Sequence, residues 1–338
     1  MVASSVALLE QFGTLLGENA RLQSQLNETF ATHLFALERL TREGQADIRS
    51  SLETVEKACR QIDSRVDQIS TALPIHFPMA ASVGSLLLTR VLNRFLMYLE
   101  ADDMSVTPHL IANGCWEKNI SDVFIQHLKP GMTVVDVGAN YGYYTLLAAS
   151  AVGWDGKSAS PGRVYAFEPN RKTFDILMKN IQVNWLGGIV QAHQLAVSDS
   201  SKHVELHIPV HFQGGSSVLR PIGQPDCTYP EECSTVRAVR LDDIVRCEVD
   251  LMKIDAEGSE PLVFEGMSGI LERSPALTIF MEFFVPMLRQ VVDPRDFLRR
   301  IRELGFSLQW FTPWQTLEPF DEERALAFAR FDLLLERK

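Results

Sequence analysis

The sequence is short of cysteine, of basic charge and of any leader-like segment. Its 338 residues hold five cysteines, an odd number without CxxC spacing, and this favours reduced thiols in a cytoplasmic protein over a disulfide framework. Cys227 and Cys233 are further apart than the pairs that usually bind zinc. The net charge of −11 argues against a general nucleic-acid binder, which needs a basic face. No basic segment precedes the first apolar residues, so no signal peptide is expected.

Long apolar runs are also missing. The most apolar candidate helix, residues 79–100, is interrupted by Arg90, Asn93 and Arg94. A spanning helix needs about 20 largely uncharged residues, so the chain is not expected to cross a membrane. Apolar residues make up 46% and charged residues 22%, which is typical of a globular protein with a sizeable core.

Proline is absent from residues 1–73, and this region is predicted to be helical. From Ile48 to Leu73 the apolar residues recur at alternating steps of 4 and 3, as in the seam of a coiled coil. Residues 8–26 keep the same rhythm, with Asn19 on the seam. Because a narrow seam suits a partner helix, residues 8–73 are predicted to make the protein a homo-oligomer. Packing of this helix on the rest of its own chain is the alternative.

Pro74 and Pro78 end this region. Residues 79–100 are then predicted to form an amphipathic helix that packs against the next domain or, alternatively, lies on a membrane surface. The predicted domains are a coiled-coil region at 1–73, a linker with the amphipathic helix at 74–104, and an α/β domain at 105–338 with an insert around 200–245.

Strand and helix patterns alternate in the α/β domain, which predicts a mostly parallel sheet with helices on both faces. Strands are predicted at residues 133–137, 163–168, 189–197, 250–255, 277–283 and 306–311. Helices are predicted at residues 143–151, 172–183, 260–272 and 294–304. Residues 328–335 are predicted to form a final edge strand. The insert contains GGSS and several prolines, which indicate a hairpin or a lid.

A turn rich in small residues follows the first of these strands. In an open parallel sheet, ligands bind beyond the carboxyl ends of the strands. Gly138 and Gly142 let the backbone approach a ligand, and the helix that begins near Tyr141 offers N–H groups to an anion such as a ligand carboxylate. Asp136 suits an ammonium group, and Glu168 is placed to accept hydrogen bonds from both hydroxyls of a ribose. The pattern indicates an adenosine ligand, and the missing third glycine of G-x-G-x-x-G disfavours a nicotinamide cofactor.

Polar residues after the third predicted strand indicate a function less clearly. Asp199 is placed to reach an adenine, with a turn-forming role as the alternative. His203, His207 and His211 alternate with apolar residues, so they are predicted to lie on the polar face of a strand rather than to bind a metal. Of the three, His211 is the one expected near the acceptor, because it lies next to GGSS.

These segments together resemble the FkbM family of S-adenosylmethionine-dependent methyltransferases. The resemblance rests on VVDVGANYGYYT, YAFEPN, LAVSD, RLDDIV, DLMKIDAEGSEPLVFEGM and FMEF in this order, with GCWEKN and GGSS as further matches. It covers about residues 105–310 and says nothing of residues 1–100. It implies a Rossmann-like methyltransferase fold, with a seven-stranded sheet whose last strand is antiparallel. It also implies methyl transfer, mostly to oxygen, on sugars of natural products, glycolipids or polysaccharides.

By position, the resemblance also implies roles for individual residues. Around S-adenosylmethionine it places Asp136, Gly138, Asn140, Gly142, Glu168 and Asp199. Near the methyl group it places Lys253, Asp255 and Glu257. Asp255 is the expected base, because a base must take a proton from the acceptor hydroxyl. Lys253 is a base only if burial lowers its pKa, and otherwise it stabilises charge.

The acceptor pocket is expected to form from residues 105–118, the insert and the loop after Phe283. Its expected contacts are Trp116, Glu117, His211 and Glu282, with Phe212 and Trp314 as further aromatic candidates for stacking on a sugar ring. No metal is assigned, although Asp255, Glu257 and Glu282 offer the hard oxygen ligands that magnesium prefers.

Other interpretations stay open. The enzyme alternatives are methylation at nitrogen or carbon of a small metabolite, and a nucleotide-sugar dehydrogenase-like use of the fold. The non-enzymatic alternative is a coiled-coil scaffold with a degenerate domain, against which the intact set of motif residues counts. The expected partners are a sugar or other hydroxylated acceptor, and association with a membrane surface or a biosynthetic complex is an additional hypothesis.

Overall fold

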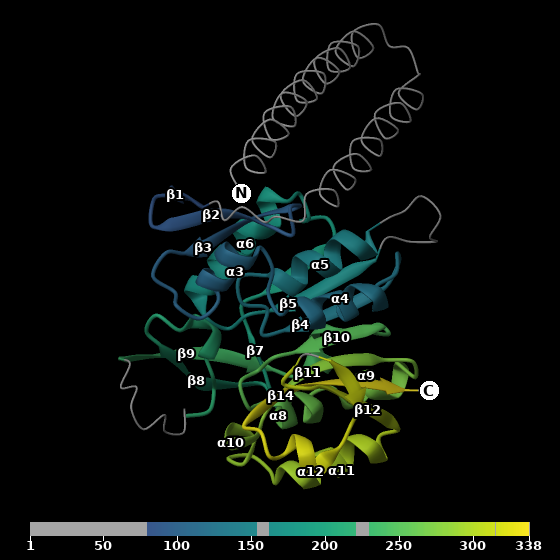
Figure 1. Ribbon diagram of the computed structural model, residues 1–338. Helices are drawn as coiled ribbons and strands as arrows, with labels where there is room; N and C mark the ends of the chain where they lie inside the picture. Colours follow the sequence, from purple (N-terminus) through teal and green to yellow (C-terminus); the bar gives the residue numbers. More distant parts are fainter. Residues whose placement is uncertain (1–79, 154–161, 221–229, 315, 338) are drawn as a thin grey trace, which may run out of the picture. The chain divides into compact units, whose positions relative to one another are not determined.

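The computed structural model describes residues 80–153, 162–220, 230–314 and 316–337 (Figure 1). They belong to one compact unit, His76–Lys338. The predicted coiled coil at 1–73 lies outside the described residues, so the self-association of residues 8–73 stays a prediction. Within the described ranges, no helix is long and apolar enough to span a membrane.

Residues 80–100 form three antiparallel strands, and the prediction of an amphipathic helix here was wrong. The strands are β1 (Ala80–Val83), β2 (Leu86–Val91) and β3 (Phe95–Glu100), in the order β1-β2-β3. Leu92, Asn93 and Arg94 join β2 to β3, and Leu92 and Asn93 have φ angles of 51° and 52°, as in a tight hairpin turn. Phe95, Met97 and Leu99 are buried at every second position of β3. The apolar positions of this segment therefore follow a period of two, which a helical spacing had hidden.

The main sheet has eight strands in the order β13-β12-β14-β11-β10-β4-β5-β6 (Figure 1). They are β4 (Thr133–Val137), β5 (Arg163–Phe167), β6 (Val190–His193), β10 (Leu251–Ile254), β11 (Thr278–Phe284), β12 (Phe306–Phe311), β13 (Leu317–Pro319) and β14 (Arg330–Arg337). The pairs from β6 to β11 are parallel, and β14 is antiparallel to both β11 and β12. Strand order reverses between β4 and β10, where α/β proteins of this kind bind ligands.

Strand β14 lies inside the sheet, so the prediction of an edge strand was wrong. Leu333, Leu334 and Leu335 have exposed fractions of 0%, 1% and 0%, which shows that both faces of this strand are covered. The edge is formed instead by β13, which adds an eighth strand to the seven expected. The other strands of the prediction are confirmed with small shifts at their ends, apart from the segment 189–197.

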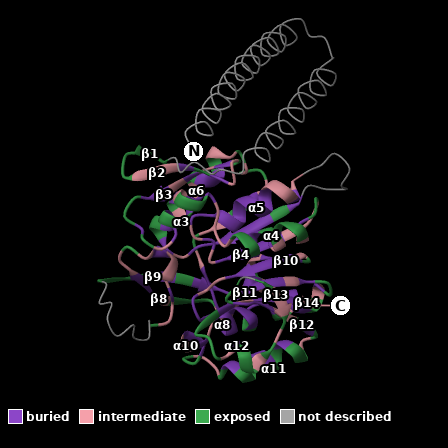
Figure 2. Ribbon diagram, in the orientation of Figure 1, coloured by how far each residue is buried: buried purple, intermediate pink, exposed green. Residues whose placement is uncertain are grey.

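Helices cover both faces of the sheet, and each layer has its own apolar core. One layer contains α3 (Thr107–Asn113), α4 (Lys118–His127), α5 (Tyr143–Val152) and α6 (Arg171–Val183), with Phe124 and Leu177 in its core. The other contains α7 (Leu241–Ile244), α8 (Glu260–Glu265), α9 (Ser268–Arg273), α10 (Val285–Leu288), α11 (Pro294–Glu303) and α12 (Glu322–Ala325), with Phe264 and Phe297 in its core. Figure 2 shows the buried residues gathered along the sheet between the two layers.

The helix predicted at residues 260–272 is two helices, α8 and α9. Gly266 lies between them, packed so closely on the chain that an added Cβ would meet the carbonyl oxygen of Ser198 at 2.1 Å. The close approach explains why a glycine is needed there, and it marks where α8 ends.

The insert forms a second sheet of three strands beside the main one. Its strands are β7 (Ala196–Val197), β8 (Lys202–Pro209) and β9 (Glu231–Val239), in the order β7-β9-β8, with the 3-10 helix η1 (Gln213–Gly215) after β8. β8 and β9 are antiparallel, which confirms the predicted hairpin. The strand predicted at 189–197 is divided, because β6 pairs with β5 whereas β7 leaves the main sheet and pairs with β9.

Candidate active site

A cavity of about 1010 Å³ lies at the carboxyl ends of β4, β5, β10 and β11. Most of the site residues expected from the sequence line it together: Trp116, Glu117, Asp136, Gly138, Asn140, Glu168, Lys253, Asp255, Glu257 and Glu282. Three expected residues, Gly142, Asp199 and His211, are not among the described residues that line it. The volume is at the upper end of the range that small-molecule sites occupy, so a cofactor and part of an acceptor fit side by side.

The glycine turn brings the backbones after β4 and β10 into contact. Gly138 has a φ of 79°, and an added Cβ would meet the carbonyl oxygen of Asp255 at 1.8 Å. Gly142 has a φ of 95° and precedes α5, where an added Cβ would meet the Leu177 side chain at 2.5 Å. Gly138 therefore shapes the cavity wall directly, whereas Gly142 lets α5 pack against α6.

Two buried carboxylates flank this turn, and uncharged groups satisfy both. The two oxygens of Glu168 accept the backbone N–H groups of Asn140 and Asn170, each at 2.9 Å. Asp136 accepts the hydroxyl of Thr145 at 2.5 Å. Burial raises the pKa of Glu168 to about 7 and that of Asp136 to about 6, and the hydrogen bonds only partly offset burial. Both carboxylates face a cavity in which a cationic ligand group would stabilise their charge.

Asp199 does not reach this cavity, so the structure does not support its expected contact with an adenine. Its carboxylate accepts the Lys202 ammonium group at 2.6 Å on the surface, and this hydrogen bond lowers the pKa of Asp199 to about 2. The cavity wall in this region is formed by Phe167, Leu195 and Val197. An apolar wall of this kind suits the face of a heterocycle better than a carboxylate does.

Lys253 is the central cation on the opposite side of the cavity. It is 1% exposed, with Nζ 3.2 Å from Asp255 Oδ2 and 3.7 Å from Asp332 Oδ1. Nζ also lies 5.4 Å from the centre of the Tyr144 ring. Burial alone would lower the pKa of Lys253, but the attraction of Asp255, Asp332 and neighbouring glutamates outweighs burial and raises it above its ordinary value. These surroundings favour the cationic form of Lys253, so of its two predicted roles they favour the stabilisation of charge over that of a base.

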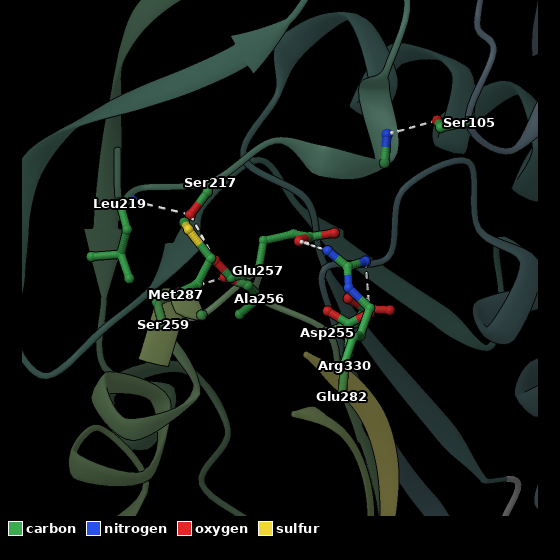
Figure 3. A network of polar contacts seen from close by, with 12 residues as sticks. Ser105, Ser217, Leu219, Asp255, Ala256, Glu257, Ser259, Glu282, Met287 and Arg330 are labelled. Carbon is green, nitrogen blue, oxygen red and sulfur yellow. Dashed lines mark hydrogen bonds and ion pairs between the residues drawn. The ribbon is translucent and has the colours of Figure 1, made fainter. Parts of the chain in front are cut away.

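Arg330 connects two further carboxylates at the same side of the cavity (Figure 3). Its guanidinium donates to Glu257 Oε2 and Glu282 Oε1, both at 3.0 Å, and lies 4.1 Å from the centre of the Phe284 ring. Burial raises the pKa of Glu257 to about 8 and that of Glu282 well above its ordinary value. Asp255, Glu257 and Glu282 each offer an oxygen within 4.8 Å of the others, the arrangement that a divalent cation would need. Arg330 already supplies positive charge to two of the three.

The side wall comes from the loop between α3 and α4. Tyr144 donates its hydroxyl to Glu117 Oε2 at 3.0 Å, and burial followed by repulsion from Asp332 raises the pKa of Glu117 to about 8. Trp116 lines the cavity beside Glu117. Both residues therefore line the cavity, and their contact with an acceptor stays a prediction.

Two predicted acceptor residues lie elsewhere. The side chain of His211 is 45% exposed and contacts Asp102, and Trp314 is 71% exposed near Arg324. Neither is among the described residues that line the cavity, whereas Phe212 is. His211 has a φ of 66° at the end of the hairpin strand, and this turn directs it away from the lining set.

The GGSS segment lies against the cavity rather than over it as a separate lid. Gly214 donates its N–H to Ser105 Oγ at 3.1 Å, and Ser217 Oγ donates to the carbonyl oxygen of Glu257 at 2.9 Å (Figure 3). Gln213 accepts from Asn170 Nδ2 at 2.9 Å. These contacts join the insert to both sides of the cavity. The side that carries Asp136 and Glu168 is called the donor side below, and the side that carries Asp255, Glu257 and Glu282 is called the acceptor side.

Sequence reasoning missed Arg330 and Asp332, which both lie on β14. A signal was present in RFDLLLE, where two charged residues alternate ahead of an apolar run and so share one face of the strand. Their partners could not be found from this signal, because the antiparallel register places Asp332 opposite Glu282, 50 positions earlier in the chain.

Comparison with known proteins agrees with the arrangement of the cavity. Residues 136–308, more than half of the chain, match the family model described as Methyltransferase FkbM domain. The chain belongs to the FkbM methyltransferase family. It is 23% identical over 198 residues to the hexuronic acid methyltransferase AglP of Haloferax volcanii, with 57% of this chain and 71% of that protein covered.

Solved structures of methyltransferases are similar at lower identity. The FkbM methyltransferase from Methylobacillus flagellatus is 14% identical with a TM-score of 0.37, covering 64% of this chain and 50% of that one. An rRNA methylase from Streptococcus thermophilus is 13% identical with a TM-score of 0.38, covering 64% of this chain and 93% of that one.

Membership of the family makes S-adenosylmethionine the methyl donor, and the residues on the donor side fit this cofactor. Gly138 has no room for a Cβ because the backbone of Asp255 lies against it, so the turns after β4 and β10 form one continuous wall of the cavity. With this cofactor bound, Glu168 would hold the ribose, and Asp136 would face the positively charged methionine end. Phe167, Leu195 and Val197 offer the adenine an apolar wall.

Proposed function

We propose that this methyltransferase transfers a methyl group to a hydroxyl oxygen of a sugar, within a polysaccharide, a glycolipid or a glycosylated natural product. The observation that carries the proposal is the pairing of Asp255 with the buried Lys253 at 3.2 Å, directly beside the glycine turn. A carboxylate next to the donor site is what proton removal from an acceptor hydroxyl needs. The name of the relative, which refers to a hexuronic acid, supports a sugar as the acceptor.

Asp255 is the base in this proposal. Its side chain is 30% exposed, which makes it accessible from the cavity, whereas Lys253 is buried. When bound, S-adenosylmethionine supplies an electrophilic methyl group. Asp255 accepts the hydroxyl proton as the new oxygen–carbon bond forms, and the Lys253 ammonium group keeps its own proton and stabilises the carboxylate before the transfer.

The other polar groups orient the acceptor. Burial raises the pKa of Glu257 and of Glu282, and the carboxyl groups of both line the cavity, where they can hydrogen-bond to hydroxyls of the acceptor. Arg330 fixes both of them from one side. Trp116 and Phe212 supply apolar surface for one face of a sugar ring. A sugar ring with several hydroxyls would find hydrogen-bond partners in these carboxyl groups and apolar contact with these aromatic side chains.

The test is incubation of the full-length protein with methyl-labelled S-adenosylmethionine and a panel of hexosides, amino-hexosides and hexuronides. Product mass and two-dimensional NMR then show which atom carries the methyl group. We expect an O-methyl ether that the wild type forms and Asp255→Asn does not. Exclusive methylation of the amino group of an amino-hexoside, or of a carbon, would overturn the assignment to oxygen. The affinity for S-adenosylhomocysteine, measured by calorimetry, shows separately whether the donor site is intact.

A further inference from the structure

A second cluster of reactive side chains lies on the hairpin of the insert, away from the proposed base. His207 on β8 is directly opposite Cys233 on β9, and Pro209 is opposite Glu231. Because side chains alternate along a strand, His207, Cys233 and Glu231 emerge on the same face of the hairpin. One nitrogen of the imidazole, one thiol sulfur and one carboxylate oxygen all lie within 4.8 Å of one another.

The spacing of these three atoms is close to that of a metal coordination shell. Cys233 Sγ is 3.5 Å from His207 Nδ1 and 3.7 Å from Glu231 Oε1. Zinc bonds of about 2.0–2.3 Å in a tetrahedral arrangement place neighbouring ligand atoms about 3.3–3.8 Å apart. The third pair, His207 Nδ1 and Glu231 Oε1, is in direct hydrogen-bond contact. The distance between these two atoms must increase when an ion binds. The Glu231 side chain is 36% exposed, so this side chain has room to move.

The charges around the cluster also favour a cation. Glu205 Oε2 lies 3.8 Å from the second ring nitrogen of His207, so two carboxylates surround one imidazole. A divalent metal ion bound at the cluster would balance the charge of these carboxylates and of a Cys233 thiolate. A carboxylate behind the free nitrogen of a ligating histidine is also a recurrent feature of metal sites.

The histidine is held in place before any ion binds. His207 is 5% exposed, and its backbone N–H and C=O both pair with Ser217, at 2.8 Å and 3.0 Å. Ser217 in turn donates to the carbonyl oxygen of Glu257, and Glu231 lines the cavity. An ion at this cluster would tie β8 to β9 at the rim of the active site.

We propose that His207, Glu231 and Cys233 bind a Zn²⁺ ion that fastens the insert hairpin beside the acceptor side of the cavity. Imidazole nitrogen, thiolate sulfur and carboxylate oxygen are the three ligand types that zinc takes in proteins. The fourth position is left to water. The site is separate from Asp255 and from the donor residues, so it does not depend on the proposed acceptor.

The experiment compares the full-length wild type with Cys233→Ser, His203→Ala and Cys247→Ser. His203 is an exposed histidine of the same strand, and Cys247 is a half-buried cysteine near Tyr165, so these two variants are the matched controls. Zinc content is measured by plasma mass spectrometry after dialysis. Binding of Co²⁺ is followed by the thiolate-to-cobalt charge-transfer absorbance, and thermal melts are recorded with and without Zn²⁺.

We expect one zinc per chain, a charge-transfer band, and a melting temperature that rises with Zn²⁺. Cys233→Ser should lose the band and bind zinc at least about tenfold more weakly, whereas both controls should behave as the wild type. Folding of each variant is checked by circular dichroism. A folded wild type that retains no zinc and gives no cobalt band would overturn the proposal, as would a band that survives Cys233→Ser.

Discussion

The two sides of the active-site cavity neutralise their buried carboxylates in different ways. On the donor side, Glu168 and Asp136 are satisfied by backbone N–H groups and a hydroxyl, which carry no net charge. On the acceptor side, Asp255 and Glu282 are paired with the charged side chains of Lys253 and Arg330. The hydrogen-bond partners of the donor-side carboxylates therefore bring no positive charge, and a cationic ligand group would stabilise their ionised forms, whereas the acceptor-side pairs hold their opposite charges within the protein.

The difference also predicts different losses of stability when a carboxylate is removed by mutation. Where its partners are neutral, the protein loses hydrogen bonds. Where its partner is charged, the mutation leaves a buried ion without an opposite charge, and this costs more free energy of unfolding. Substitutions on the two sides should therefore differ in both the property they affect and the size of the effect.

The largest effect is expected for Asp255→Asn, which removes the base but preserves the shape of the side chain. We expect kcat to fall about 10²–10⁴-fold, because general base catalysis contributes by about this factor. The Kd of S-adenosylhomocysteine should change by less than about twofold, since the donor side is untouched. Steady-state kinetics and calorimetry check both. An unchanged kcat would show that another group accepts the proton, and Glu257 and Glu282, whose oxygens lie within 4.8 Å of Asp255, would be the next candidates.

Lys253→Met should destabilise the fold more than any surface lysine substitution. Removing the cation leaves Asp255 and Asp332 facing each other without compensation, and breaking a buried pair costs about 3–5 kcal/mol. Lys202→Met is the matched control, because Lys202 pairs with Asp199 while 41% exposed, and such pairs contribute about 0–1 kcal/mol. Urea denaturation gives both values. Equal losses for the two variants would contradict a stabilising role for the buried cluster.

The same comparison explains which parts of the site were predictable from the sequence. The donor side is local: Glu168 and its partner Asn140 are 28 positions apart, within one strand-turn-helix-strand unit whose pattern is visible in the sequence. The acceptor side needs β14, whose register brings Arg330 back to Glu257 from 73 positions away. No local pattern specifies such a pairing, so Arg330 and Asp332 were missed.

The fold shows the same division. The parallel strands and their helices were predicted closely, because short apolar runs, which are typical of strands buried on both faces, alternate along the chain with segments of helical pattern. The meander at 80–100 and the inner position of β14 were not, because each depends on which strands pair across the sheet. Asp199 was misplaced for a related reason. β7 leaves the main sheet to pair with β9, and although Val197 still lines the cavity, Asp199 lies beyond the end of β7 and pairs with Lys202 on the surface.

The donor side is tested by Glu168→Ala against Asp199→Ala. Loss of the Glu168 carboxylate removes the proposed ribose contact and leaves the N–H groups of Asn140 and Asn170 without their acceptor. We expect the Kd of S-adenosylhomocysteine to rise about 10–100-fold, since each lost partner of a buried donor costs about 1–3 kcal/mol. Asp199→Ala should change the Kd by less than about twofold, because Asp199 lies outside the cavity. An equal rise of the Kd in both variants would show that Asp199 contributes to the donor site after all.

The smallest effect is expected in the dependence of stability on pH. Burial, with repulsion from Asp332, raises the pKa of Glu117 from 4.5 to about 8. A carboxyl group with a raised pKa in the folded state contributes stability that is fully present below pH 4.5 and is lost as pH rises through about 8. The melting temperature should therefore fall between about pH 4.5 and pH 8, and the fall should be smaller in Glu117→Gln, which cannot ionise. Glu232→Gln, at an exposed position of β9, is the control and should melt as the wild type does at every pH.

A fall of the melting temperature in Glu117→Gln as large as in the wild type would show that Glu117 is already ionised at neutral pH. The acceptor side would then carry one more negative charge than its cations balance.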